Sequence, residues 1–115
     1  MKVIRPTLKE RKRYILFKVH SDKEVHKDEV VEQCTTACLR FLGELGCAEA
    51  GVQFLPETWN MKNQTGIIKT GHKFVDKTKA SLALIKEIGE KKATVSTVLT
   101  SGSLNKIKEN QNGVK

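Results

Sequence analysis

Residues 14–19, Tyr-Ile-Leu-Phe-Lys-Val, constrain the fold more than any other stretch of the chain. The segment is rich in β-branched and aromatic residues and therefore predicts a strand. One face of this strand is fully apolar and consists of Ile15, Phe17 and Val19. The other face is mixed and consists of Tyr14, Leu16 and Lys18. Because side chains alternate between the two faces, we expect the first face to be packed and the second to be half-solvated or covered by another element.

Two stretches show the apolar spacing of amphipathic helices. In residues 30–45, apolar side chains recur at spacings of three and four, and Gly43 or Gly46 can close this helix with a left-handed cap. The arc predicted to face the core consists of Val30, Val31, Cys34, Ala37, Cys38, Phe41, Leu42 and Leu45. The second helix is expected over about residues 73–88, where Gly89 stops it.

Three further segments are typical of strands. Residues 51–56 alternate in polarity, and Pro56 is expected to end that strand. Residues 65–70 are interpreted as the second arm of a hairpin, so these two strands should pair antiparallel. Residues 93–99 predict the last strand, and residues 104–110 a short helix.

The resulting order, β-α-β-β-α-β with an added C-terminal helix, predicts an α+β, ferredoxin-like sandwich. We expect a four-stranded antiparallel sheet with two helices on one face. A chain of 115 residues fits one domain with its own core. We divide it into a basic N-terminal arm at 1–12, a single domain at 13–110 and a flexible tail at 111–115.

The net charge of +8 is unevenly distributed along the chain. Residues 1–20 carry seven Lys and Arg against one Glu, and residues 61–92 carry eight Lys against three acidic residues. Between them, residues 21–60 carry eight acidic residues against three basic ones. Such clustering favours a polyanionic partner, and a nucleic acid in particular, over the alternative of a merely solvated lysine-rich surface.

The cations that we expect to contact RNA phosphates lie in the arm and around the end of the second hairpin strand. They are Arg5, Lys9, Arg11, Lys12, Arg13, Lys69, Lys73 and Lys77. Contacts of this kind position a protein on RNA without reading its sequence. Base stacking on an open sheet is not expected to dominate, because residues 65–70 contain no aromatic side chain.

No catalytic or metal-binding constellation is evident in the sequence. His20, His26 and His72 lie in three different segments. Cys34 and Cys38 lie on the apolar side of the first helix, where core packing is a better interpretation than zinc binding. Cys47 is placed in the loop after that helix. We therefore predict no catalytic residue, no bound metal and no cofactor held by the protein itself.

The cysteine pattern and the hydropathy bear on location. Three cysteines without a Cys-x-x-Cys pair indicate reduced thiols, and we expect a cytoplasmic protein. Nothing approaches the roughly 18 consecutive apolar residues of a membrane span, so a membrane partner is not expected.

Several apolar side chains are candidates for contact with a partner protein. They are Tyr14 and Leu16 on the mixed strand face, Leu39 on the acidic face of the first helix, and Trp59 and Met61 in the connection at 57–64. For Trp59 an alternative stays open, in which its ring folds down and closes the hairpin end of the core.

The basic arm and first strand, Arg-Pro-Thr-Leu-Lys-Glu-Arg-Lys-Arg-Tyr-Ile-Leu-Phe-Lys-Val at 5–19, resemble the N-terminal signature of ribonuclease P protein component 2. That family is the archaeal counterpart of a small protein subunit of eukaryotic ribonuclease P. The resemblance continues through residues 66–69, 72–77, 83–88 and 100–104. Two places depart from the family pattern: the segment 57–64, and Ser103, where threonine is expected.

The resemblance implies a non-catalytic, RNA-binding subunit of the ribonucleoprotein endoribonuclease that removes 5′ leaders from precursor tRNA. In such a particle the RNA is catalytic and uses Mg²⁺. The implied partners are ribonuclease P RNA, precursor tRNA in the holoenzyme, and a TIM-barrel protein subunit, with a homodimer of the present chain inside a heterotetramer. The alternative is a protein-only regulatory or small-ligand-binding module of the same fold.

Overall fold

The predicted first strand lies at the centre of an antiparallel sheet. In this computed structural model, which describes residues 11–111, β1 (Lys12–Ser21) pairs with β3 (Thr65–Gly71) on one side and β5 (Lys91–Ser101) on the other. β2 (Gln53–Asn60) adds to β3, and β4 (Glu87–Ile88) adds to β5. The sheet order is therefore β2-β3-β1-β5-β4, with every pairing antiparallel.

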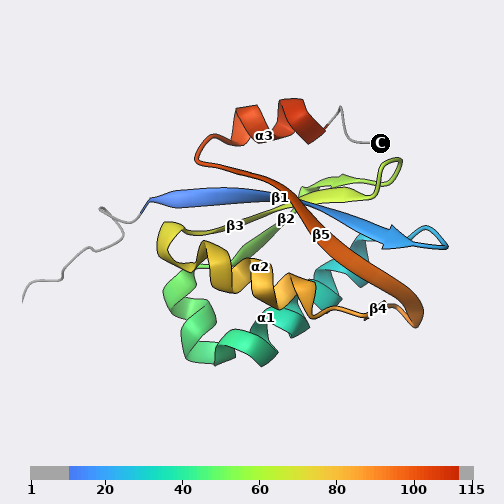
Figure 1. Ribbon diagram of the computed structural model, residues 1–115, viewed down its shortest axis with the longest axis horizontal. Helices are drawn as coiled ribbons and strands as arrows, with labels where there is room; N and C mark the ends of the chain where they lie inside the picture. Colours follow the sequence, from blue (N-terminus) through green and yellow to red (C-terminus); the bar gives the residue numbers. More distant parts are fainter. Residues whose placement is uncertain (1–10, 112–115) are drawn as a thin grey trace, which may run out of the picture.

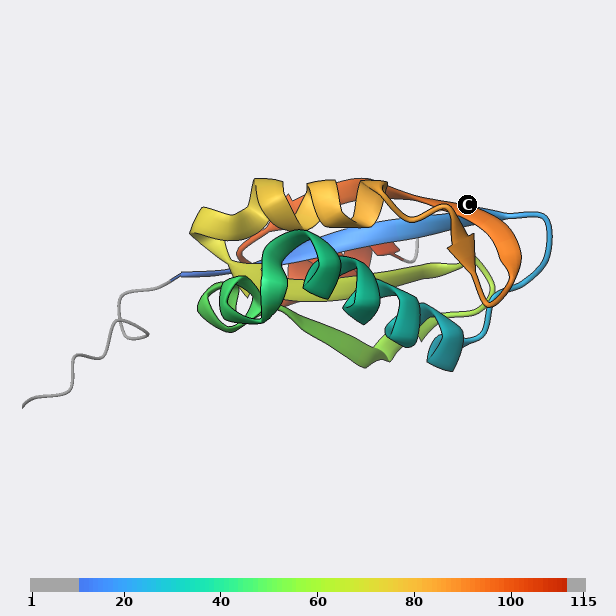
Figure 2. The same cartoon turned by 90° about the horizontal axis from the view of Figure 1, so that it is seen from below.

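Helices cover both faces of this sheet. α1 (Lys27–Ala50) and α2 (Val75–Ala83), the latter preceded by the short 3-10 turn η2 (His72–Phe74), lie on one face. α3 (Leu104–Gln111) lies on the opposite face (Figure 1). The view from below places α1 and α2 side by side in front of the sheet (Figure 2). No helix in the described part of the chain is long and apolar enough to cross a membrane.

The sheet has five strands rather than the four that we predicted, although the α+β architecture is compatible with a ferredoxin-like fold. The extra strand exists because α2 ends at Ala83 and not near residue 88. The chain then extends through β4 and reverses at Gly89 and Glu90, which both have positive φ, 57° and 68°. A type I′ turn, the common two-residue turn of β-hairpins, requires positive φ at both of its central residues.

Helix α1 is longer than predicted and is interrupted. Gly43 has non-helical angles, φ 78° and ψ 169°, and the helix then resumes to Ala50. The cap is Gly51, in the left-handed conformation, whose N–H donates to the Cys47 carbonyl. The interruption rotates the last turns, so Leu45 is 78% exposed instead of facing the core as its spacing had predicted. Phe41, just before the interruption, is also exposed.

Strand β2 continues past Pro56, which we had expected to end it. β2 is an edge strand, where a residue without an N–H is tolerated. Its register with β3 shifts between Leu55 and Asn60, and the Thr58 side chain fills the irregularity. The Thr58 hydroxyl donates to the Leu55 carbonyl (2.6 Å) and accepts from the Ile67 N–H (3.1 Å).

β1 separates two hydrophobic clusters, as the alternation of its side chains predicted. The cluster beneath α1 and α2 includes Phe17, Val19, Val30, Cys34, Ile68, Leu82, Ile85 and Ile88. The smaller cluster on the opposite face consists of Leu16, Leu55, Ile67 and Ile107. Because Ile107 belongs to α3, the mixed face of β1 is covered by the C-terminal helix.

Gln111 connects the end of α3 to the β2–β3 hairpin through hydrogen bonds. Its side-chain amide donates to the Thr58 carbonyl (2.7 Å), the Thr65 carbonyl (3.3 Å) and the Thr65 hydroxyl (3.0 Å). Its own carbonyl accepts from Asn63 Nδ2 (2.9 Å). We had assigned Gln111 to the tail, but it is buried and belongs to the domain. The remainder of the predicted tail lies outside the described residues.

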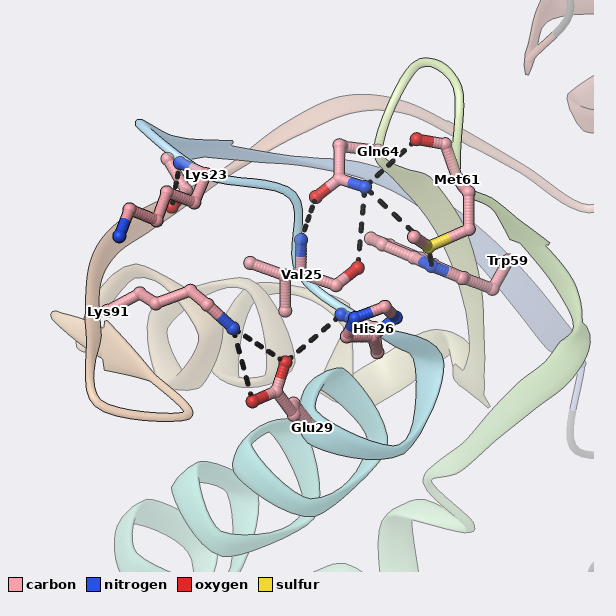
Figure 3. Close-up of polar contacts among 9 residues, drawn as sticks. Lys23, Val25, His26, Glu29, Trp59, Met61, Gln64 and Lys91 are labelled. Carbon is pink, nitrogen blue, oxygen red and sulfur yellow. Dashed lines mark hydrogen bonds and ion pairs between the residues drawn. The ribbon is translucent and has the colours of Figure 1, made fainter.

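Glu29 joins the start of α1 to the β4–β5 hairpin (Figure 3). One carboxylate oxygen accepts from the His26 N–H at 3.1 Å, and Lys91 Nζ lies 3.0 Å from that oxygen. These contacts lower the pKa of the Glu29 carboxyl from its usual value of 4.5, and the hydrogen bond from the His26 N–H has the largest effect. A side chain at Gly89 would collide with this carboxylate.

Replacing Gln111 by alanine should destabilise the domain by roughly 1–3 kcal/mol, because buried acceptors on Thr58 and Thr65 lose their donor. Urea unfolding followed by circular dichroism measures this change. The matched control is Asn110→Ala, which removes an exposed amide that donates only within α3. Equal unfolding midpoints for the two variants would contradict the anchoring role.

Acid should destabilise the wild-type protein more than the Glu29→Gln variant. A carboxyl whose pKa is lower in the folded state adds stability above its unfolded pKa and loses it as the pH falls through the folded pKa. Urea midpoints measured from pH 6 down to pH 3 should therefore converge for the two proteins. Parallel curves over that range would show that Glu29 carries no pH-linked stability.

Candidate nucleic-acid and partner interfaces

The predicted RNA-binding cations gather at one end of the sheet, where β1 begins and β3 ends. Lys12 pairs with Gly71, and Tyr14 with Lys69. η2 and the first turn of α2 follow β3 directly, at the left of Figure 1. The cations brought together, which we call the basic end, are Arg11, Lys12, Arg13, Lys69, Lys73 and Lys77. Arg5 and Lys9, also predicted to bind RNA, lie outside the described residues.

The side chains of the basic end are available for an anionic ligand. Arg11, Lys73 and Lys77 are exposed, and the other three are half-buried. Arg13 Nη1 donates to the Lys12 carbonyl (3.1 Å), and Lys77 Nζ lies 5.7 Å from the centre of the Phe74 ring. Within residues 11–111, none of these cations forms an ion pair. Among the described residues, none of them is therefore in direct contact with a carboxylate, and the nearest acidic residue in sequence is Asp76 in the first turn of α2.

His72 is a residue of this end that the sequence analysis did not single out. Its backbone N–H donates to the Arg11 carbonyl (2.8 Å) and so holds the start of β1 against η2. Its ring Nδ1 is buried and has no hydrogen-bond partner in the described part of the chain. Two sequence signals could have identified it: its position between Lys69 and Lys73, and its place in the segment 72–77 that resembles the family.

The mixed face of β1 is not an open platform. Leu16 is fully buried under α3, and Tyr14 is half-buried beside the same cluster. α3, rather than a partner protein, therefore covers Leu16, which we had placed among the partner contacts. Stacking of bases on this face would require α3 to leave it.

Trp59 lies against the core and is only partly exposed. Its ring stacks on Phe17, with centroids 6.3 Å apart, and its indole N–H donates to the Met61 sulfur at 3.2 Å (Figure 3). Gln64 Nε2 donates in turn to the Met61 carbonyl (3.0 Å), and Gln64 Oε1 accepts from the Val25 N–H (2.9 Å). Trp59 therefore closes the hairpin end of the core, as in the alternative interpretation of this residue.

A small hollow lies between α1 and the edge strand β2, which we call the α1–β2 groove. Its volume is about 120 Å³. Its lining consists of Cys34, Thr35, Cys38, Leu39, Cys47, Val52, Phe54 and Ile68. Leu39 is 43% exposed at the rim of the groove, so this predicted partner contact lies on an accessible surface.

The three cysteines meet at this groove as free thiols. Burial raises the pKa of Cys34, and burial together with the nearby Cys47 raises the pKa of Cys38 to about 11. Cys47 lies on α1 rather than in a following loop, and partial burial raises its pKa as well. In the described part of the chain, no group of three or more His, Cys, Asp or Glu side chains could hold a metal ion.

A second hollow, at the far end of β1, has balanced charges. Its volume is about 690 Å³, and it lies between the end of β1 and the β4–β5 hairpin. Two lysines in its lining, Lys86 and Lys92, are matched by Asp22 and Glu87. This end of the sheet is therefore less suited to a polyanion than the basic end.

Comparison with known proteins gives one family and one fold. The model of the Rpp14/Pop5 family matches residues 13–111. "Ribonuclease P protein component 2" of Pyrococcus furiosus is 40% identical over 111 residues, covering 93% of this chain and 88% of that protein. The protein of the same name from Methanocaldococcus jannaschii is 36% identical over 115 residues, covering 100% of this chain and 83% of that protein.

The fold is shared with a solved structure of low sequence identity. A chain in the cryo-EM structure of yeast ribonuclease MRP superposes with a TM-score of 0.61 and 17% identity. The match covers 98% of this chain and 96% of that chain. At this identity the likeness shows the fold alone.

The thiols of the groove should react in the order of their exposure and acidity. With iodoacetamide at pH 8, Cys47 should be alkylated first in the native protein. Cys38, with a pKa of about 11, has roughly one thiolate per thousand molecules at that pH, and Cys34 is fully buried. Mass spectrometry of digested samples measures the three rates, and urea should equalise them. Native Cys34 reacting as fast as Cys47 would contradict the described packing.

Proposed function

This chain belongs to the Rpp14/Pop5 family, and on that premise we propose that it is a protein subunit of ribonuclease P that binds the RNA of that enzyme. The observation that supports RNA binding most directly is the basic end. Six Lys and Arg side chains from β1, β3, η2 and α2 gather there without an ion pair among residues 11–111. A phosphate backbone is the ligand that such a surface favours.

The proposed role is to position RNA and not to perform chemistry. Lysine and arginine contacts to phosphates fix the orientation of an RNA without reading its bases. Lys12 begins the central strand and pairs with Gly71, and the carbonyl of Arg11, directly before the strand, accepts from the His72 N–H, so the backbone of both residues is bonded to the β3–η2 segment. In this proposal the hydrolysis of precursor tRNA is carried out by the RNA with its own Mg²⁺, and the protein supplies no catalytic group.

The proposal extends to partners and location. We place the chain beside precursor tRNA in the holoenzyme and in contact with a TIM-barrel protein subunit, as a homodimer inside a heterotetramer in the cytoplasm. The names of the Pyrococcus furiosus and Methanocaldococcus jannaschii relatives support membership of a ribonuclease P particle. The exposed Leu39 supports a protein contact in addition to the RNA contact.

The alternative of a small-ligand-binding module has less support. The α1–β2 groove, at about 120 Å³, is smaller than the roughly 300–1,000 Å³ of sites that enclose drug-sized ligands. The larger hollow near β4 has balanced charges and is open to solvent. The polar side chains that line the larger hollow, among them His20, Asp22 and Lys86, surround an open surface that would not enclose a metabolite.

Replacing Arg11, Lys12 and Arg13 together by alanine should weaken binding to ribonuclease P RNA and flatten its dependence on salt. Each lost phosphate contact lowers the slope of log K against log salt by roughly 0.7–0.9, so three should lower it by about 2 to 3. At 0.1 M salt the loss should be on the order of 10²-fold. Filter binding at several KCl concentrations measures both quantities.

The matched control replaces Lys23, Lys86 and Lys92 by alanine, which removes the same charge at the opposite end of β1. It should change the salt slope much less than the triple substitution in the basic end. Thermal melts establish that both proteins fold. An unchanged slope for the Arg11, Lys12 and Arg13 variant would refute the assignment of RNA binding to the basic end.

A further inference from the structure

The α1 wall of the α1–β2 groove carries a stripe of exposed side chains. Asp28, Glu32, Thr35 and Leu39 follow one another at spacings of four, three and four residues, so they share one side of the helix. All four are exposed. Thr35 and Leu39 line the groove, and the two carboxylates continue the stripe toward the start of α1.

The opposite wall is the edge strand β2. Phe54 of β2 and Val52, which directly precedes the strand, line the groove; both pack against the larger cluster but are only partly buried. The outer edge of β2 pairs with no strand within residues 11–111. Apolar side chains and free backbone groups therefore lie next to each other along this edge. Such an edge is a site where another chain can add.

The charge around the groove identifies the kind of partner. Four carboxylates are exposed on α1, at Asp28, Glu32, Glu44 and Glu49, against two exposed cations on that helix, Lys27 and Arg40. This excess of carboxylates on the helix that forms the α1 wall repels RNA phosphates and attracts a basic protein segment. The apolar floor excludes a purely polar ligand. An apolar cavity of about 150 Å³ can hold benzene, so a hollow of about 120 Å³ has room for one aliphatic side chain.

We propose that the α1–β2 groove is the docking site for a partner protein, which inserts one aliphatic side chain from a basic segment beside Leu39. This inference rests on the proposed function, because it specifies where the protein partner of the RNA-binding subunit sits. The groove also adjoins the basic end. Lys12 Nζ lies 3.4 Å from the position that a Cβ would take at Gly51, which immediately precedes Val52 of the groove. A protein docked here would therefore lie next to RNA held at the basic end.

The test uses the full-length chain and the purified TIM-barrel subunit of ribonuclease P, the partner proposed above, with binding measured by isothermal titration calorimetry. Leu39→Glu should weaken binding at least tenfold, because it places a charge where an apolar side chain inserts. Glu32→Lys should also weaken binding and reduce its salt dependence. The matched control, Leu84→Glu, changes another exposed leucine, at the end of α2 and outside the groove, and should bind as the wild type does.

Two further measurements locate the contact. Cys47 lines the groove, so its alkylation by iodoacetamide should slow when the TIM-barrel subunit is bound. Affinity for ribonuclease P RNA should be the same for Leu39→Glu and wild type. If instead the RNA affinity of the wild type were absent, the proposed function would fail while the groove measurements could still succeed.

Three results would overturn the docking proposal. The first is that the TIM-barrel subunit binds the Leu39→Glu variant as tightly as the wild type, or that it does not bind the wild type at all. The second is an unchanged rate of Cys47 alkylation in the complex. The third is conversion of a dimer of this chain to a monomer by Leu39→Glu, seen by light scattering, with partner binding unchanged, because a second copy would then occupy the groove.

Discussion

The burial of β1 on both faces is the constraint on which the rest of the structure depends. Phe17 and its neighbours on one face require α1 and α2, and Leu16 on the other face requires α3. A strand buried on both sides offers no open surface for a ligand over β1 itself. The two proposed binding surfaces lie elsewhere, the basic end where β1 begins and the α1–β2 groove at the edge of the sheet.

The two surfaces have opposite charge and share a border. The basic end displays lysine and arginine side chains without ion pairs in the described residues, whereas exposed carboxylates outnumber exposed cations on α1, which forms one wall of the groove. Lys12, close to Gly51, lies between them. The basic end repels a basic protein, and the groove repels RNA. In our proposal, charge therefore directs RNA and a basic protein to separate, neighbouring sites. This arrangement suits a subunit that joins components of a particle.

The sequence was sufficient for the features that depend on local pattern. Alternation in residues 14–19 predicted the two faces of β1, and the run of cations predicted which residues gather at its start. It was insufficient where tertiary contacts decide. Ile85 and Ile88 continue the helical spacing of α2, so the pattern predicts a helix to residue 88, although α2 ends at Ala83 and the chain turns at Gly89 and Glu90. The bonds of Gln111 to Thr58 and Thr65 join residues that are distant in the chain, so nothing local revealed them. Leu16 had the pattern of a partner contact because α3, which covers it, is far away in sequence.

The central claim is that this chain works as an RNA-bound subunit of ribonuclease P. The most direct measurement is purification of the tagged, full-length protein from its native cell, followed by sequencing of the RNA and mass spectrometry of the proteins that accompany it. The account predicts recovery of ribonuclease P RNA together with a TIM-barrel protein. Recovery of neither, from cells in which the particle is shown to be intact, would contradict it.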